Sequence, residues 1–99
     1  MIELPWPRVF NWDEGNRDKS RLKHGISCEE AEQVFDDPDL RILPDPGHSF
    51  IEERYLAFGK NVSGKKLLIG FTMRFGEIRP ISARRANLRE RKKYEKRDS

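Results

Sequence analysis

Residues 65–83 carry the sequence KKLLIGFTMRFGEIRPISA, which predicts two antiparallel strands joined by a tight turn at Phe75-Gly76. Side chains on a strand alternate between its two faces, so one face of the first strand receives Leu67, Ile69, Phe71 and Met73. Arg74 has the opposite parity and is expected to project away from the core. The first of these two strands is the clearest element in the sequence.

A further strand is predicted immediately before the hairpin, over residues 53–60, with Asn61-Val62-Ser63-Gly64 as the connecting turn. Together the three strands form an antiparallel meander over residues 53–83. Pro80 lacks a backbone donor and indicates an edge or a bulge in the last strand. Two short strands are expected nearer the N-terminus, at residues 8–12 and 41–43.

Three helices are predicted around these strands. Asp13 is a suitable N-cap for a first helix over residues 14–24, which would stop at Gly25. Ser27 and Glu30 form an S-x-x-E capping box at the start of a second helix, which ends before Pro38. A weakly anchored final helix is expected over residues 84–97. The predicted fold class is α+β, with two N-terminal helices, the sheet and a C-terminal helix in a single domain spanning residues 1–99.

Length and charge limit the possible functions. The chain has 99 residues and a net charge of +3, which suits one small domain with a thin core. Residues 79–99 hold nine Lys or Arg against three Asp or Glu, so the basic charge is concentrated at the C-terminal end. A lone cysteine and an early apolar stretch broken by charges and prolines predict a soluble cytoplasmic protein without a signal peptide or membrane span.

The basic C-terminal end is typical of a surface that binds a polyanion. Lys and Arg neutralise phosphates and release counterions, which gives salt-sensitive binding without sequence preference. Docking of an acidic protein partner would explain the same charges equally well. The candidate RNA-binding residues are Arg85, Arg89, Arg91 and Lys92.

Charged residues also recur along the meander, at Glu53, Arg54, Arg74 and Arg79. A sheet face with a carboxylate and several guanidinium groups offers what RNA cleavage without a metal requires, namely a proton-transfer group and cations for the charged transition state. A lattice of cross-strand salt bridges is the structural alternative, and spacing alone favours it.

The strand parities do not settle which charges share a face. If Leu56 and Phe58 face the core, then Glu53 is displayed outward together with Tyr55. Ile78 and Ile81 have opposite parity in the last strand, so the face of the intervening Arg79 stays open.

Several other kinds of site are not supported by the sequence. His24 and His48 lack a partner at zinc-ligand spacing, and Asp36-Asp37-Pro38-Asp39 is better explained as a helix stop than as a metal site. Phosphate-binding glycine motifs and a nucleophile elbow are absent. We therefore expect neither a metal nor another cofactor.

Five blocks in order along the chain resemble the BrnT-type toxins, ribonucleases of bacterial type II toxin–antitoxin systems. The blocks are Phe10-Asn11-Trp12-Asp13 with Asn16; Lys23-His24-Gly25-Ile26-Ser27 with Glu29-Glu30-Ala31; Phe35-Asp36-Asp37-Pro38; Glu53-Arg54 with Gly59; and residues 78–86 with Glu90-Arg91 and Tyr94. The resemblance covers most of the chain.

The resemblance implies a RelE-like fold that cuts RNA without a metal and inhibits translation until a cognate antitoxin neutralises it. The antitoxin is expected to be BrnA-like, with a ribbon-helix-helix domain that contacts operator DNA. The candidate catalytic residues carried over are Lys23, His24, Glu53, Arg54, Arg74, Arg79 and Arg84.

The roles of these candidates are hypotheses. Arg74 and Arg79 would bind the phosphate, Lys23 would assist electrostatically, and either Glu53 or His24 would transfer the proton. A non-catalytic nucleic-acid-binding or regulatory module is the alternative function, and an adaptor that acts only through a partner is a third.

Overall fold

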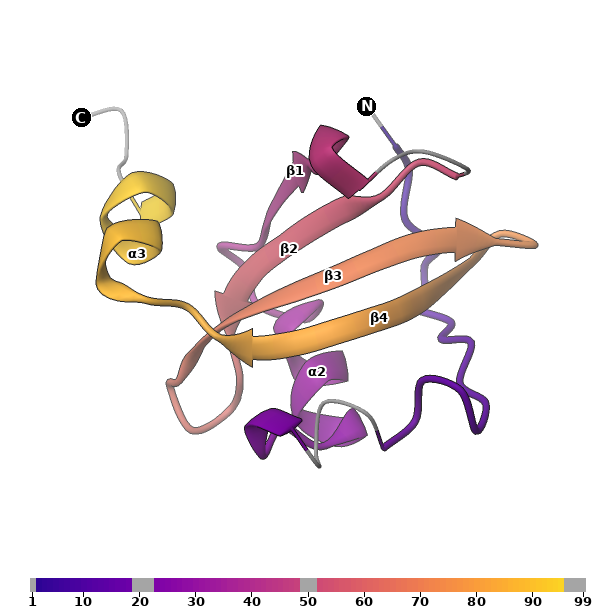
Figure 1. Ribbon diagram of the computed structural model, residues 1–99, viewed down its shortest axis with the longest axis horizontal. Coiled ribbons are helices and arrows are strands. Elements are labelled where there is room, and N and C mark those ends of the chain that lie inside the picture. Colours follow the sequence, from indigo (N-terminus) through magenta and orange to yellow (C-terminus); the bar gives the residue numbers. More distant parts are fainter. Residues whose placement is uncertain (1, 19–22, 49–51, 96–99) are drawn as a thin grey trace.

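The computed structural model describes residues 2–18, 23–48 and 52–95, and its centre is a four-stranded antiparallel sheet in the order β1-β2-β3-β4 (Figure 1). The elements are, in chain order, α2 (Cys28–Val34), β1 (Arg41–Pro44), a short 3-10 helix η1 (Pro46–His48), β2 (Tyr55–Lys60), β3 (Lys66–Arg74), β4 (Glu77–Arg85) and α3 (Leu88–Glu95). This arrangement confirms the α+β class and the meander, formed by β2, β3 and β4.

One face of the sheet, here called the inner face, carries the core and packs against α2. Leu67, Ile69 and Phe71 of β3 are fully buried there, as their alternation predicts. Phe35, just after α2, packs edge-on against Phe71 and against Phe10, with ring centroids 5.3 and 5.4 Å apart. Such aromatic pairs add to the free energy gained from burial alone.

The start of α2 confirms the predicted capping box. The Ser27 hydroxyl accepts a hydrogen bond from the Glu30 amide, and the Glu30 carboxylate accepts one from the Ser27 amide. Ala31 and Val34 then face the sheet and are buried. The cap thus sets where the helix begins, and the apolar spacing sets which side it buries.

The orientation of β2, which the sequence left open, is the one in which Leu56 and Phe58 do not face the core. Ala57 pairs with the buried Ile69 and faces the core, together with Tyr55. Leu56 and Phe58 lie on the other side, here called the outer face, where the Tyr94 ring of α3 packs 5.6 Å from that of Phe58. Phe58 is therefore covered by α3 and not by α2, whereas Leu56 stays partly exposed on the outer face.

A bulge in β4 resolves the conflicting parity of its isoleucines. The register between β3 and β4 shifts at Gly70/Phe71, which face Ser82 and Pro80, so Ile81 is the extra residue. Ile78 is fully buried on the inner face, whereas Arg79 pairs with Thr72 on the outer face. The bulge that Pro80 indicated is thus confirmed.

The N-terminal expectations are only partly correct. The predicted strand over residues 8–12 is reduced to an isolated parallel bridge between Phe10 and Ile78 at the edge of β4. Residues 14–18 form turns in place of the first helical turns, and their geometry is fixed by the buried Asn16, whose amide donates to the carbonyls of Asn11 and Pro80. Residues 19–22 of the predicted first helix lie outside the described residues.

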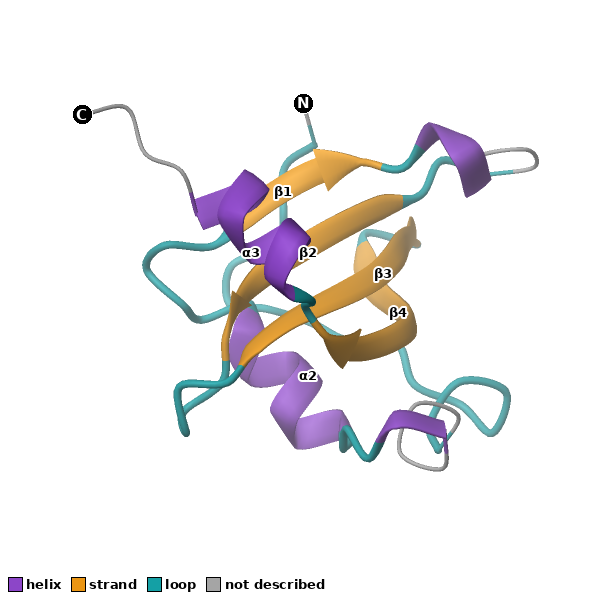
Figure 2. Ribbon diagram, turned by 60° about the vertical axis from the view of Figure 1, so that its left-hand side comes forward, coloured by secondary structure: helices purple, strands orange, loops and turns teal. Residues whose placement is uncertain are grey.

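The C-terminal helix begins four residues later than predicted, at Leu88 rather than residue 84. Arg84 and Arg85 pair with Leu68 and Leu67 and so extend β4 instead. Figure 2 shows α3 and α2 on opposite sides of the sheet. None of the described helices is long and apolar enough to cross a membrane.

Candidate functional site

A hollow of about 320 Å³ lies on the outer face of the sheet, and two of the predicted arginines line it. Arg54 directly precedes β2, and Arg84 lies near the end of β4. The hollow is lined by Asp45, Arg54, Leu56, Leu68, Gly70, Ile81, Ser82 and Arg84. Two guanidinium groups on an apolar floor can bind an anion with less competition from water than on an open surface.

Glu90 of α3 holds Arg84 at the rim of this hollow. The two side chains form a two-pronged ion pair with distances of 2.8 and 2.7 Å, and the Arg84 side chain remains 41% exposed. Glu90 is itself fixed, because it caps α3 through reciprocal hydrogen bonds with Asn87. The hydrogen bonds from Arg84 hold the pKa of Glu90 below its usual value, and the pKa of Arg84 is raised in turn.

Arg74 and Arg79 lie further along the same face, toward the hairpin of β3 and β4. Arg74 pairs with Glu52 at 3.3 Å on the surface. Arg79 is better enclosed: it donates to Asn11 Oδ1 at 2.8 Å and contacts Asp13 Oδ2 at 3.0 Å. Hydrogen bonding from Arg79 also lowers the pKa of Asp13.

These ion pairs agree in part with the alternative interpretation of the charged residues as a lattice of salt bridges, because Arg74, Arg79 and Arg84 each have a carboxylate partner. The partners come from the loop before β2, the N-terminal segment and α3, and not from neighbouring strands as a cross-strand lattice would require. The pairs therefore connect separate elements to the sheet. They also leave the hollow itself open between Arg54 and Arg84.

Glu53 is not on the face that carries the arginines. It lines a broad groove of about 850 Å³ with Tyr55, Arg8 and apolar residues of the N-terminal segment and β1. Its backbone carbonyl accepts a hydrogen bond from Thr72 Oγ1 at 2.7 Å. The outward position considered for Glu53 depended on Leu56 and Phe58 facing the core, and they do not.

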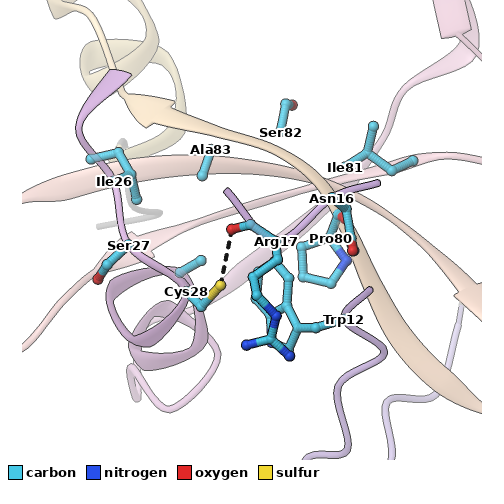
Figure 3. Close-up of a pocket in the computed structure, with 11 residues that line it drawn as sticks. Trp12, Asn16, Arg17, Ile26, Ser27, Cys28, Pro80, Ile81, Ser82 and Ala83 are labelled. Carbon is cyan, nitrogen blue, oxygen red and sulfur yellow. Dashed lines mark hydrogen bonds between the residues drawn. The ribbon is translucent and has the colours of Figure 1, made fainter. Parts of the chain in front are cut away.

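Lys23 and His24 are exposed and line neither the hollow on the outer face nor the groove beside Glu53. The nearby segment after them, Ile26 to Cys28, borders a small pocket between the start of α2 and β4 (Figure 3). This pocket holds about 10 Å³, about the space of one water molecule. Cys28 Sγ contacts the carbonyl of Arg17 at 3.1 Å, and burial raises the pKa of its thiol.

The predicted RNA-binding residues are all on the surface. Arg85 ends β4, and the other three lie on α3, where no residue is buried. The four exposed residues are Arg85, Arg89, Arg91 and Lys92. α3 is attached to the sheet through the Phe58–Tyr94 contact and through ion pairs of Lys66 with Glu95 and of Arg84 with Glu90.

Of the residues that line the hollow, only Arg54 and Arg84 were predicted as site residues. The polar residues Asp45 and Ser82 and the strand glycine Gly70 were missed. Asp45 lies between β1 and η1, and its backbone amide donates to the carbonyl of Arg54, which places it beside that residue. Gly70 and Ser82 are partners across the bulge, and a Cβ on Gly70 would lie 2.7 Å from Ser82 Oγ. A glycine in the middle of a strand opposite an expected bulge was the available signal.

The described residues contain no group of three or more His, Cys, Asp or Glu side chains that could hold a metal ion. A comparison with curated proteins gives no match. The model of one protein family, described as the ribonuclease toxin BrnT of type II toxin–antitoxin systems, matches residues 12–90. The match spans the turns around Asn16, the whole sheet and Glu90 at the rim of the hollow, and the chain therefore belongs to the BrnT family of ribonuclease toxins.

Proposed function

We propose that this protein is an endoribonuclease that cuts RNA in the cytoplasm without a metal ion, and that its active centre is the hollow on the outer face. The observation that carries the proposal is that Arg54, Arg84 and Asp45 line the same hollow, in a chain that belongs to a family of ribonuclease toxins. Arginine suits this task because it remains charged and can grip two phosphate oxygens at once.

The chemistry assigned to the hollow is an attack of the ribose 2′-oxygen on the adjacent phosphorus. The 2′-hydroxyl gives its proton to a base as the new P–O bond forms, and the bond from phosphorus to the 5′-oxygen breaks. The leaving 5′-oxygen takes up a proton, so the products are a cyclic phosphate and a 5′-hydroxyl. Arg54 and Arg84 would neutralise the charge that gathers on the phosphate oxygens in the transition state.

Asp45 is the carboxylate in the hollow and is our candidate for the proton-transfer group. Glu90 would be a positioning residue, because it fixes the Arg84 guanidinium without lining the hollow. Arg74 and Arg79 would bind the RNA backbone further along the face. Lys23, His24 and Glu53 stay predicted site residues, and substrate binding would have to bring RNA to them.

We further propose that a cognate, BrnA-like antitoxin neutralises the toxin by covering the outer face and α3. The support is the exposed charge of α3, which would attract an acidic partner segment as well as RNA. Antitoxin binding and RNA binding should therefore exclude each other. A complex that still binds RNA as tightly as the free toxin would count against occlusion.

The test of the proposed activity is digestion of total RNA by the purified protein in EDTA. Arg84→Ala should lower the cleavage rate by about 10²- to 10³-fold, the usual loss when one stabilising donor is removed. Arg85→Ala is the matched control, because it removes the same charge from the neighbouring residue on the other side of β4. Arg85 is a predicted RNA-binding residue outside the hollow, so its loss should lower the rate by less than about tenfold. Salt-sensitive binding of RNA that stays intact would instead support the non-catalytic binding module.

A further inference from the structure

The tip of the β3–β4 hairpin carries a residue that the fold does not require. Phe75 has a φ of +54°, followed by Gly76 at +75°, which makes the two-residue turn in which both residues are left-handed. Asparagine or glycine suits the first position of this turn, whereas a bulky aromatic residue is disfavoured there. The Phe75 side chain is also 95% exposed, so burial does not compensate for the backbone conformation.

The other hairpin of the meander shows what a turn selected for stability looks like. Between β2 and β3 the turn begins at Asn61, whose side-chain oxygen accepts hydrogen bonds from the amides of Ser63 and Lys65. Its amide group also reaches Glu30 on α2. The chain thus places a structural asparagine at one hairpin and an exposed phenylalanine in a strained conformation at the other.

The position of Phe75 relates it to the outer face. From Gly70 in the hollow to Phe75 the chain runs five strand residues, or roughly 17 Å. Arg74 and Arg79 lie on the outer face along this path. The hollow, these two arginines and the ring at the tip therefore form a line along β3 and β4.

We propose that Phe75 is a stacking platform for an unpaired base of single-stranded RNA whose backbone follows this line to the hollow. The inference rests on the proposed function, because it takes the hollow as the place where RNA is bound. Stacking on an aromatic ring beside a cationic track is a common way to hold single-stranded nucleic acid, and it requires only one exposed ring face. The Arg74–Glu52 pair is exposed, so phosphate can compete for Arg74 at little cost.

A base is a better partner for this ring than an apolar protein surface. Protein–protein hot spots are aromatic residues surrounded by contacts that exclude water. Phe75 instead stands at a hairpin tip between a charged strand residue, Arg74, and a glycine. A single ring with a neighbouring cation suits a nucleotide, because the base can stack on the ring while the phosphate contacts the cation.

The variant Phe75→Asn separates stacking from folding, because Asn-Gly is a preferred sequence for this turn. The variant should fold with an unfolding temperature at least as high as that of the wild type. Phe75→Trp should retain stacking. Val62→Asn is the matched control, since Val62 is another exposed apolar residue, 82% exposed, at the other hairpin.

The experiment measures binding of a single-stranded RNA that carries 2′-O-methyl riboses, which prevent cleavage, and 2-aminopurine, whose fluorescence falls when it stacks. Phe75→Asn should weaken binding by about 5- to 150-fold and abolish the fluorescence decrease, whereas Phe75→Trp keeps both and Val62→Asn changes affinity by less than about twofold. Equal binding and equal quenching by Phe75→Asn would overturn the inference, as would absence of RNA binding by the wild type at low salt.

Digestion of total RNA in EDTA, run in parallel, distinguishes this inference from the proposed function. Wild-type protein that stacks RNA through Phe75 but does not cut it would support the stacking platform and overturn the endoribonuclease. If the wild type and Phe75→Asn both cut RNA, and at the same rate, the result would support the endoribonuclease and overturn the stacking platform. Loss of antitoxin binding alone in Phe75→Asn would overturn the inference and assign the ring to a protein partner.

Discussion

The two faces of the sheet are filled by different kinds of residue for different reasons. On the inner face Ile69, Phe71 and Ile78 are fully buried beneath α2 and the N-terminal segment. On the outer face α3 covers only the end near Phe58, and the hollow beside it is lined by Arg54 and Arg84. Packing explains the inner residues, whereas charged residues on an open face do not increase the burial of the core. Substitutions should therefore affect stability on the inner face and RNA cleavage on the outer face.

Phe71→Ala should break the inner face most severely. Removal of this fully buried ring leaves a cavity next to Phe35, and such changes cost about 3–5 kcal/mol of unfolding free energy. Urea denaturation measures the loss. Phe75→Ala is the control at an exposed phenylalanine and should change the free energy by less than about 0.5 kcal/mol. Similar losses for the two variants would contradict the assignment of the core.

Ser27→Ala tests the helix that covers the inner face. The hydroxyl satisfies the Glu30 amide at the start of α2, and loss of such a cap costs about 1 kcal/mol. Thermal unfolding followed by circular dichroism should show the decrease, and Ser27→Asp should restore most of it. A Ser27→Ala protein as stable as the wild type would mean that packing alone fixes the start of α2.

Acid should weaken the ion pairs that connect other elements to the outer face. The folded-state pKa values of Asp13 and Glu90 are lowered, mainly by hydrogen bonds from Arg79 and Arg84. Their contribution to stability is therefore present above the unfolded pKa values of about 4 and is lost as the pH falls through the lower folded values.

Urea midpoints measured from pH 7 down to pH 3 should decrease at the acid end, and Glu90→Gln should make this decrease smaller. An identical pH profile in the two proteins would show that the Arg84–Glu90 pair contributes nothing to stability.

Arg74→Ala should have the smallest effect on stability, about 0–0.5 kcal/mol, because the Arg74 side chain is 45% exposed and pairs at the surface are screened by solvent. Its effect should appear in RNA affinity, measured by a titration at two salt concentrations. The variant should bind more weakly and show a reduced salt dependence, since one phosphate contact is lost. An unchanged salt dependence would remove Arg74 from the proposed RNA path.

The meander was predictable because every second residue of β3 from Leu67 to Met73 is apolar, and Ser27 and Glu30 similarly marked the start of α2. The faces of β2 were not predictable, since Leu56 and Phe58 are apolar on one side and Tyr55 and Ala57 on the other. The pairing of Ala57 with the buried Ile69 and the contact of Tyr94 with Phe58 decide between the two arrangements. Apolar periodicity cannot assign a strand that is covered on both faces.

The candidate site was predicted in part for a similar reason. Arg54 was named from the charges along the meander and from the resemblance, and Arg84 was named from the resemblance. The fold brings the two to one hollow. Asp45 was missed because its position beside Arg54 depends on how β1 continues past β2, a long-range property that local motifs do not contain. The separation of Glu53 from the arginines follows from the same register.

The most direct test of the hollow as the active centre compares two double variants that each lose two positive charges. Arg54→Ala/Arg84→Ala removes both guanidinium groups from the hollow, and Arg85→Ala/Arg89→Ala removes two exposed ones outside it. The measurement is the single-turnover rate of RNA cleavage in EDTA, with circular dichroism to confirm that both proteins fold. We predict a loss of about 10³-fold or more for the first and less than about tenfold for the second. Equal rates for the two variants would contradict the account.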